Sequence, residues 1–385
     1  MTNLNPVTAL QRFGQSVWLD DLRRGLFTSG KFGRLIAEDG LRGVTSNPSI
    51  FEKAIAGTSE YAASLREIEG GTRMAPVELY ETLAIRDIRT AADLLRPVYQ
   101  ATGRADGYAS LEVSPFLAYD TDGTIQEARR LWHAVGRDNV MIKVPASREG
   151  VPAIRQLTTE GINVNITLLF GLERYEEVAR AYIDGLTTFA NSGGDLATVS
   201  SVASFFVSRI DMLADELITH RLSTTADPDT RAALTELLGH VAIANAKLAY
   251  QKYLALCRTD GWQSLAAKGA RPQRLLWAST STKNASYRDV RYVEELIGRD
   301  TVTTLTLATM DAFREHGRLR ASLEEDLEHA HRAIETLQRL DISLSEIADK
   351  LLDDGVALFS SAFERLLASV RHATSSPGER AESLR

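Results

Sequence analysis

Short apolar or alternating runs recur along the chain, and segments with helical periodicity separate them. Eight of these runs have the length and boundaries of strands: 16–20, 43–47, 108–114, 140–146, 162–169, 197–204, 274–279 and 302–306. Between them, apolar residues recur at spacings of three and four, which is typical of amphipathic helices. Strands that alternate with helices in this way predict an α/β fold, a TIM barrel of eight β/α units.

A doubly wound open sheet is the alternative fold, but its usual glycine-rich G-x-G-x-x-G turn does not follow the first strand. We therefore expect residues 1–385 to form a single TIM-barrel domain. Two helical stretches exceed what the barrel needs: a helical insertion at 211–273 and C-terminal helices at 318–373. The polar end, 374–385, is expected to fray.

The alternation within the strands places polar side chains on the inner face of the barrel. In the run 140–146, Val140, Ile142 and Val144 face outward, so Lys143 faces inward. The same test places further polar residues inward near strand ends: Asp20, Asn47, Glu112, Asn165 and Thr167. One such residue alone would suggest a buried polar side chain whose hydrogen bonds are met within the core. Several strands with the same feature favour an active site, which barrels build at the carboxyl ends of their strands.

An inward lysine near carboxylates has three interpretations. Lys143 could form a structural ion pair, anchor an anion, or act as a nucleophile that forms a Schiff base. Burial lowers the pKa of a lysine and frees the amine to attack a carbonyl, and a neighbouring carboxylate can then move protons. The residues alone leave these interpretations open.

Two segments are candidates for binding a phosphate. Arg209 follows the sixth strand in "SFFVSRID", and "ASTSTKN" after the seventh strand offers Ser279, Ser281 and Lys283. Hydroxyl groups and N–H groups at a loop-to-helix junction suit an anion. A helix N-cap over 279–282 and a surface arginine are the equally weighted alternatives.

Composition and charge exclude several classes of protein. The net charge of −7 argues against broad nucleic-acid binding, and no run is long and apolar enough to span a membrane. The lone Cys257 excludes a disulfide within the chain, and the seven histidines fall in helical or connecting segments, so we expect no metal site. The first residues do not look like a signal peptide, and we expect a cytoplasmic protein.

Four motifs in order resemble the transaldolase family: "GVTSNPSIF", "MIKVPAS", "GINVNITLLF" and "SFFVSRID". The segments "WLDDL" and "WASTSTKN" resemble the long, actinobacterial type of transaldolase. The resemblance implies a class I aldolase barrel with its Schiff-base lysine on the fourth strand, where Lys143 falls. It also implies a reaction that needs neither cofactor nor metal.

The implied reaction belongs to the pentose phosphate pathway. A dihydroxyacetone unit passes from sedoheptulose 7-phosphate or fructose 6-phosphate to glyceraldehyde 3-phosphate or erythrose 4-phosphate. By the resemblance, Lys143 attacks the donor ketone, Asp20 moves the proton of the C4 hydroxyl, and Glu112 and Thr167 hold a water. The implied substrate-binding residues are Asn47, Asn165, Ser204, Phe206 and Arg209.

The segment after the seventh strand departs from the family. Many members have Ala-Ser-Phe-Arg-Asn where this chain has "ASTSTKN", so the second phosphate cation would be Lys283, which comes two residues later and lacks the arginine fork.

Three alternative functions remain on the sequence alone. A fructose 6-phosphate aldolase would release free dihydroxyacetone and would need no acceptor. A catalytically silent barrel would only bind sugar phosphates. The extra helices could also bind another protein or a second copy, as in a homodimer.

Overall fold

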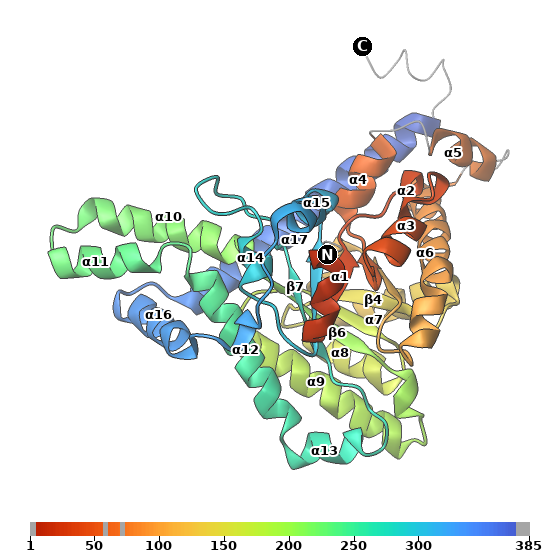
Figure 1. The fold of residues 1–385 in the computed structure, drawn as a ribbon. Coiled ribbons are helices and arrows are strands. Elements are labelled where there is room, and N and C mark those ends of the chain that lie inside the picture. The colour runs from red at the N-terminus through yellow and green to blue at the C-terminus, as the bar shows by residue number, and fades with distance from the viewer. Residues whose placement is uncertain (1–4, 57–60, 70–73, 375–385) are drawn as a thin grey trace, which may run out of the picture.

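The computed structural model describes residues 5–56, 61–69 and 74–374 of the 385-residue chain. Eight parallel strands pair in chain order, and the eighth pairs with the first, so the sheet closes into a barrel. Helices surround this barrel (Figure 1). The predicted (β/α)8 TIM barrel is therefore confirmed.

Each predicted strand overlaps an observed one, although the boundaries differ. The largest error concerns the run 197–204: its first residues belong to the 3-10 helix η3 (Leu196–Thr198), and the strand extends to Phe206. The observed strands are β1 (Gln15–Leu19), β2 (Gly43–Thr45), β3 (Tyr108–Glu112), β4 (Val140–Pro145), β5 (Val164–Leu169), β6 (Ser201–Phe206), β7 (Arg274–Ala278) and β8 (Thr301–Leu305).

The first helices, α1 (Pro6–Ala9) and the 3-10 helix η1 (Leu10–Phe13), precede β1, and the other helices before β6 follow the strands in the usual β/α order. They are α2 (Arg24–Thr28), α3 (Lys31–Glu38), α4 (Pro48–Ala56), α5 (Ala62–Glu69), α6 (Pro76–Ala101), α7 (Thr121–Val135), α8 (Gly150–Thr159) and α9 (Leu172–Asn191), with the 3-10 helix η2 (Pro115–Leu117). Local signals set some of their ends. The Asp120 carboxylate caps α7 by accepting the N–H of Gly123, and Gly136 ends this helix at φ 60°.

The helices after β6 include those outside the basic barrel. They are α10 (Ser208–Thr224), α11 (Pro228–Leu237), α12 (Val241–Cys257), α13 (Asp260–Ala266), α14 (Arg291–Glu294), α15 (Leu307–His316), α16 (Leu327–Arg339) and α17 (Leu344–Thr374), with the 3-10 helix η4 (Ser322–Glu324). The pair α10 and α11 projects from the molecule beside α16 (Figure 1). The segment 211–273 is helical, and we keep the interpretation that it is an insertion. The predicted frayed end beyond Thr374 lies outside the described residues.

The helix α17 is the element most relevant to the site. It packs against α4 and α6 and also contacts β5, so it crosses the carboxyl-end side of the barrel (Figure 1). The Cβ of a larger residue at Gly355 would lie 2.8 Å from the side chain of Leu168, which itself sits at the irregular end of β5 with φ 54°. Because Gly355 has no side chain, α17 can lie directly against Leu168 at the mouth of the barrel.

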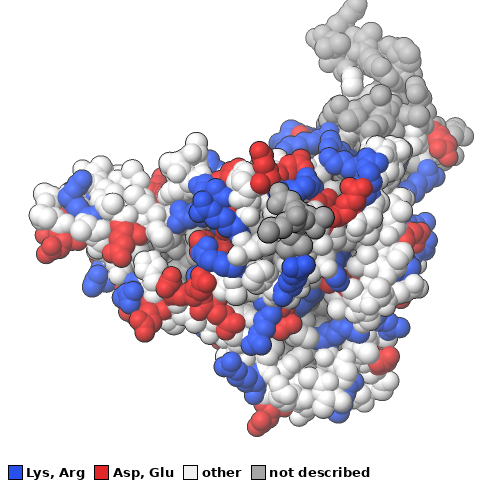
Figure 2. Space-filling view, in the orientation of Figure 1, with Lys and Arg blue, Asp and Glu red and all other residues white. Residues whose placement is uncertain are grey.

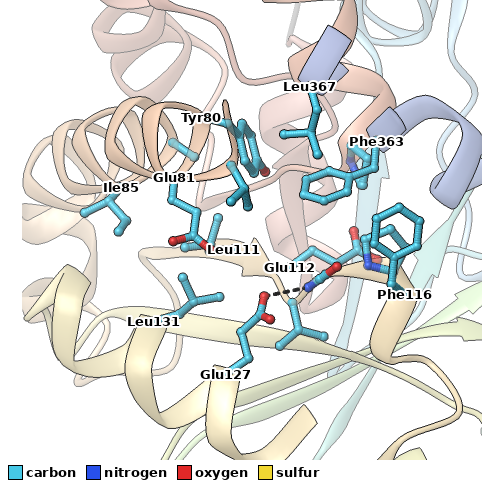
Figure 3. Close-up of a pocket in the computed structure, with 16 residues that line it drawn as sticks. Tyr80, Glu81, Ile85, Leu111, Glu112, Phe116, Glu127, Leu131, Phe363 and Leu367 are labelled. Carbon is cyan, nitrogen blue, oxygen red and sulfur yellow. Dashed lines mark hydrogen bonds between the residues drawn. The ribbon is translucent and has the colours of Figure 1, made fainter. Parts of the chain in front are cut away.

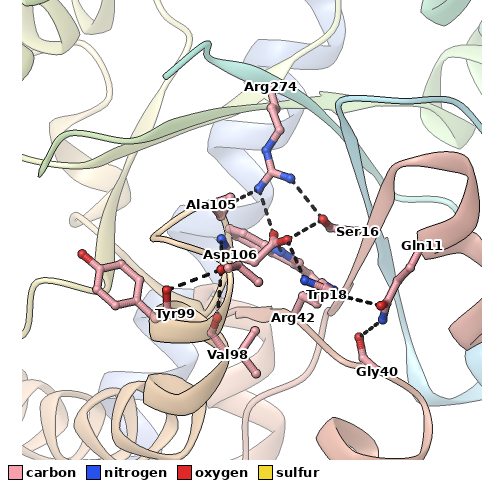
Figure 4. Close-up of polar contacts among 11 residues, drawn as sticks. Gln11, Ser16, Trp18, Gly40, Arg42, Val98, Tyr99, Ala105, Asp106 and Arg274 are labelled. Atoms are coloured by element: carbon pink, nitrogen blue, oxygen red, sulfur yellow. Dashed lines mark hydrogen bonds and ion pairs between the residues drawn. The ribbon is translucent and has the colours of Figure 1, made fainter. Parts of the chain in front are cut away.

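A buried aromatic ring and a polar cluster close the amino-terminal end of the barrel. The indole of Trp18 is fully buried and lies over Gly43, where an added Cβ would be 2.4 Å from the ring. Its Nε1 donates to the carboxylate of Asp106, which also accepts from Ser16 Oγ and Arg274 (Figure 4). Arg42 lies 3.6 Å from the same carboxylate. The buried carboxylate of Asp106 thus joins four side chains at the amino-terminal end of the barrel, opposite the cavity described below.

Replacing Asp106 with Asn should destabilise the protein by roughly 2 kcal/mol, because two partly buried arginines lose their counter-charge. Urea unfolding would measure this change. Asp93→Asn is the matched control, since the Asp93–Arg137 pair is more exposed and should contribute less than about 1 kcal/mol. Equal losses in the two variants would show that the Asp106 cluster has no special structural role.

Candidate active site

A cavity of about 290 Å³ opens at the carboxyl ends of the strands. All but two of the sequence-predicted site residues line it: Asp20, Asn47, Lys143, Thr167, Ser204, Phe206, Arg209, Ser279, Ser281 and Lys283. The other two, Glu112 and Asn165, are hydrogen-bonded to lining residues. We call this space the catalytic cavity. The structure therefore brings all the predicted residues together at the end of the barrel where such folds place their chemistry.

The ammonium group of Lys143 is buried in a salt bridge and also reaches the catalytic cavity. Its Nζ donates to Glu112 Oε2 at 3.0 Å and to the carbonyl of Ser46 at 2.9 Å. Lys143 and Glu112 are direct partners on the adjacent strands β4 and β3. The ion pair expected under one interpretation thus exists, and it places a proton acceptor within reach of the amine.

Burial raises the pKa of Glu112, and the nearby Asp20 acts in the same direction. The positive charge and hydrogen bond of Lys143 oppose this rise. A carboxyl whose pKa is raised is better suited to accept and return a proton near neutral pH than an ordinary surface carboxylate. Glu112 therefore lies where it could exchange a proton with the Lys143 amine.

Asp20 stands at the first position after β1. Its N–H donates to the carbonyl of Leu305, and this bond continues the backbone hydrogen bonding between β1 and β8. Its carboxylate accepts a hydrogen bond of 2.8 Å from Thr45 Oγ1. This fixed orientation presents a second carboxylate to the catalytic cavity, as the strand alternation predicted.

The hydroxyl of Thr167 lacks a hydrogen-bond partner among the described residues. Thr167 is fully buried and lines the catalytic cavity, opposite Pro145 of β4. An unsatisfied buried hydroxyl is costly, so such a group in a cavity wall is available for a water or a ligand.

Amide and hydroxyl groups lie at, or directly behind, a second wall of the catalytic cavity. Asn165 donates to Ser110 Oγ at 3.0 Å and accepts from Ser204 Oγ at 2.7 Å, so its amide is held rigidly between β3 and β6. The side-chain oxygen of Asn47 caps α4 by accepting the N–H of Ile50, which leaves its NH₂ group for the cavity. These groups can hydrogen-bond the hydroxyls of a polyol.

The loop after β7 corrects one prediction. No helix begins at 279–282; the chain remains a loop up to α14, so neither the loop-to-helix junction nor the N-cap exists there. Ser279 adopts the left-handed region at φ 55°, and its Oγ lies 3.0 Å from Ser208 Oγ at the start of α10. This bond ties the loop to the segment that carries Arg209.

Positive charge gathers at one end of the catalytic cavity. Arg209 lies over the ring of Phe206, and neither Arg209 nor Lys283 has a carboxylate partner within the described ranges. Burial lowers the pKa of Arg209. Burial also lowers the pKa of Lys283, and the charges of Arg209 and Lys53 add to this effect, whereas Asp20 opposes it. Cations placed so close together, with no carboxylate in a salt bridge to either among the described residues, indicate an anion site.

Sequence reasoning missed several lining residues, and two of them bear on the site: Lys53 and Phe359. Lys53 comes from α4, and its neighbour Glu52 is paired with Arg365 of α17. Phe359 comes from α17, more than two hundred residues from Lys143 in sequence. Lys53 comes two residues after the end of the motif that contains Asn47, and this proximity was the one signal that could have pointed to it. Nothing in the sequence pointed to Phe359.

Comparison with known proteins gives a consistent result. The family model described as "Transaldolase/Fructose-6-phosphate aldolase" matches residues 17–370. A transaldolase of Trichodesmium erythraeum is 46% identical over 95% of this chain and 97% of its own length. Transaldolases of Thiobacillus denitrificans and Thermobifida fusca are 46% and 44% identical, over 95% of this chain and 100% and 97% of their own lengths.

Replacing Lys53 with Ala should weaken the binding of inorganic phosphate by about three- to tenfold, since an exposed cation at the rim contributes roughly 1 kcal/mol. Lys283→Ala should have a similar effect. Calorimetric titration at low ionic strength would measure both. Lys268→Ala, an exposed lysine outside the cavity, is the matched control. Wild-type affinity in Lys53→Ala would remove this residue from the anion site.

Proposed function

Because the chain belongs to the transaldolase/fructose-6-phosphate aldolase family, we propose that its transaldolase activity proceeds through a Schiff base on Lys143. The enzyme is a transferase that moves a dihydroxyacetone unit from a ketose phosphate to an aldose phosphate. The observation that carries the proposal is the buried Lys143–Glu112 pair at the wall of a polar cavity that also contains Asp20 and an anion-binding end.

The first step is attack of the Lys143 amine on the ketone of the donor. Glu112, 3.0 Å from Nζ, accepts the proton that the ammonium must lose. The carbinolamine then loses its hydroxyl as water and becomes an iminium. A water held between Glu112 and the free hydroxyl of Thr167 relays the proton that this departure requires.

The second step breaks the C3–C4 bond. Asp20 removes the proton from the C4 hydroxyl, the electrons of the C3–C4 bond move toward the iminium, and an aldose phosphate leaves. The remaining enamine stays bound to Lys143 until an acceptor aldehyde arrives. Its carbon attacks the acceptor carbonyl, Asp20 returns the proton, and water hydrolyses the new iminium to release the product ketose.

The remaining residues hold the substrate. The rigid amide of Asn165, with Ser204 and the NH₂ group of Asn47, suits the hydroxyls of the dihydroxyacetone unit. The cationic end suits the phosphate: Arg209 and Lys283 supply charge, and Ser279 supplies a hydroxyl. Phe206 lies under the guanidinium of Arg209 and packs on Phe170.

A fructose 6-phosphate aldolase is the alternative within the same family. It shares the Schiff-base half of the reaction and releases free dihydroxyacetone. We favour transfer because the relatives named as transaldolases match along nearly the whole chain. Turnover that needs an aldose phosphate acceptor would distinguish transfer from simple cleavage.

The wider setting remains part of the proposal. We propose a place in the pentose phosphate pathway, a cytoplasmic location and sugar phosphates as the ligands. A second copy of the chain, in a homodimer, is one candidate partner. No helix of the described residues is long and apolar enough to cross a membrane. Figure 2 shows acidic and basic side chains interspersed over the visible face, and the net charge of −7 does not favour a nucleic-acid partner.

Borohydride reduction in the presence of fructose 6-phosphate, without acceptor, should trap a three-carbon adduct on Lys143. Peptide mass analysis would identify the site and the mass of the adduct. Lys143→Arg should give none while remaining folded. An adduct on another lysine, or no adduct on the folded wild-type protein, would overturn the proposed mechanism.

Asp20→Asn should still form the Schiff base but should not break the C3–C4 bond, because the C4 hydroxyl then lacks its base. The trapped adduct should therefore keep all six carbons of fructose 6-phosphate. We expect kcat to fall by at least about 10²-fold. A three-carbon adduct at the wild-type rate would assign the proton transfer to another group.

A further inference from the structure

A second cavity of about 300 Å³, which we call the rear cavity, lies between β3, α6, α7 and α17 (Figure 3). Most of its wall is apolar. Its polar side chains come from Tyr80, Glu81, Glu112, Ser114 and Glu127. Two of the acids are engaged elsewhere, because Glu81 binds Arg130 and Glu127 accepts the N–H of Ser114. The mechanism proposed above makes no use of this space.

The rear cavity and the catalytic cavity share a wall. Glu112 lines the rear cavity, whereas Lys143 lines the catalytic cavity, and the salt bridge joins them through the wall. On α17, Phe359 lines the catalytic cavity, and Phe363, one turn later, lines the rear cavity. The proposed proton acceptor is therefore accessible from the side opposite to the substrate.

The hydroxyl of Tyr80 has no hydrogen-bond partner in the described part of the chain, although the residue is only 7% exposed. Its ring is held edge-on between Phe51 and Phe363, at centroid distances of 5.5 and 5.4 Å. Burial raises the pKa of this phenol, and among the neighbouring acids Glu112 contributes most to the rise. Tyr80 thus remains a proton donor in the wall of the cavity that Glu112 also lines.

The rear cavity reaches the surface. Val77 at the start of α6 is 37% exposed and Phe116 after β3 is 52% exposed, and both line it. A space of this volume holds several waters, and a water there can bond the Tyr80 hydroxyl and the carboxylates.

The reaction needs a route for water. Formation of each iminium releases one water, and hydrolysis consumes one. During both steps a phosphorylated sugar occupies the catalytic cavity, with its phosphate at the cationic end. Glu112 separates the catalytic cavity from the rear cavity, which opens to the surface, so water could reach Glu112 from that side.

We propose that the rear cavity is the water reservoir of the reaction, and that Tyr80 is a positioning residue that holds its innermost water against Glu112. The ketone oxygen of the donor leaves as water past Glu112, and the oxygen of the product ketone comes from the reservoir. This inference rests on the proposed Schiff-base function.

Two variants restrict the rear cavity without touching the catalytic cavity. Val77→Trp narrows the exposed mouth, and Ala84→Leu fills the interior. In a single turnover of fructose 6-phosphate and erythrose 4-phosphate in H₂¹⁸O, the wild-type product should carry solvent oxygen at its ketone carbon. Both variants should retain more of the donor's oxygen, and kcat should fall about tenfold with KM unchanged.

Tyr80→Phe separates the two parts of the inference. It leaves the reservoir open, so labelling should stay at the wild-type level while kcat falls and the borohydride-trapped fraction of Lys143 rises. Leu94→Trp is the matched control for Val77→Trp, because Leu94 is also an exposed apolar residue of α6 but does not line the cavity.

Wild-type labelling and kcat in folded Val77→Trp and Ala84→Leu would overturn the reservoir, and wild-type kcat in Tyr80→Phe would overturn the role of the phenol. Failure of the proposed function itself would look different. In that case the wild-type protein would give no trapped adduct on Lys143, whatever the state of the rear cavity. An enzyme-free sample corrects for spontaneous exchange of the ketone oxygen.

Discussion

The buried salt bridge between Lys143 and Glu112 is the constraint on which the site depends. Two charges withdrawn from water are tolerated only when each satisfies the other, and here the Ser46 carbonyl takes one further N–H of the amine. Their pairing follows from the register of β3 and β4, in which they are direct partners. A slip of one residue would turn them to opposite faces of the sheet and would leave both charges unpaired.

Strand alternation predicted much of this arrangement because it is a local property of the sequence. The inward positions of Asp20, Lys143, Asn165 and Thr167 needed only a period of two and the assumption of a barrel. The salt bridge shows why the ion-pair and Schiff-base interpretations were hard to separate. The pairing that stabilises the buried lysine also supplies the proton acceptor that a nucleophilic amine needs.

What the sequence could not predict depends on contacts between distant segments. The helical spacing of apolar residues over 344–374 shows that α17 buries one face against the rest of the protein. It does not show that Phe359 would reach the catalytic cavity. Lys53 lies close to a recognised motif, yet only the direction of α4 shows that it joins Arg209 and Lys283. The loop after β7 was misassigned because hydroxyl-rich segments fit both an N-cap and an irregular turn. The rear cavity has no sequence pattern at all.

The position of α17 ties the chemistry to the completion of folding. The catalytic cavity forms only when β1 pairs with β8, and Phe359 of α17 also lines it. Its lining therefore combines residues from both halves of the sequence. Contacts over such separations form late, since loop closure must precede them. A barrel that has collapsed without docking α17 would contain the lysine, but would leave its amine open to water. Under the proposed mechanism, the cavity that shields the Lys143 amine is therefore complete only in the fully folded molecule.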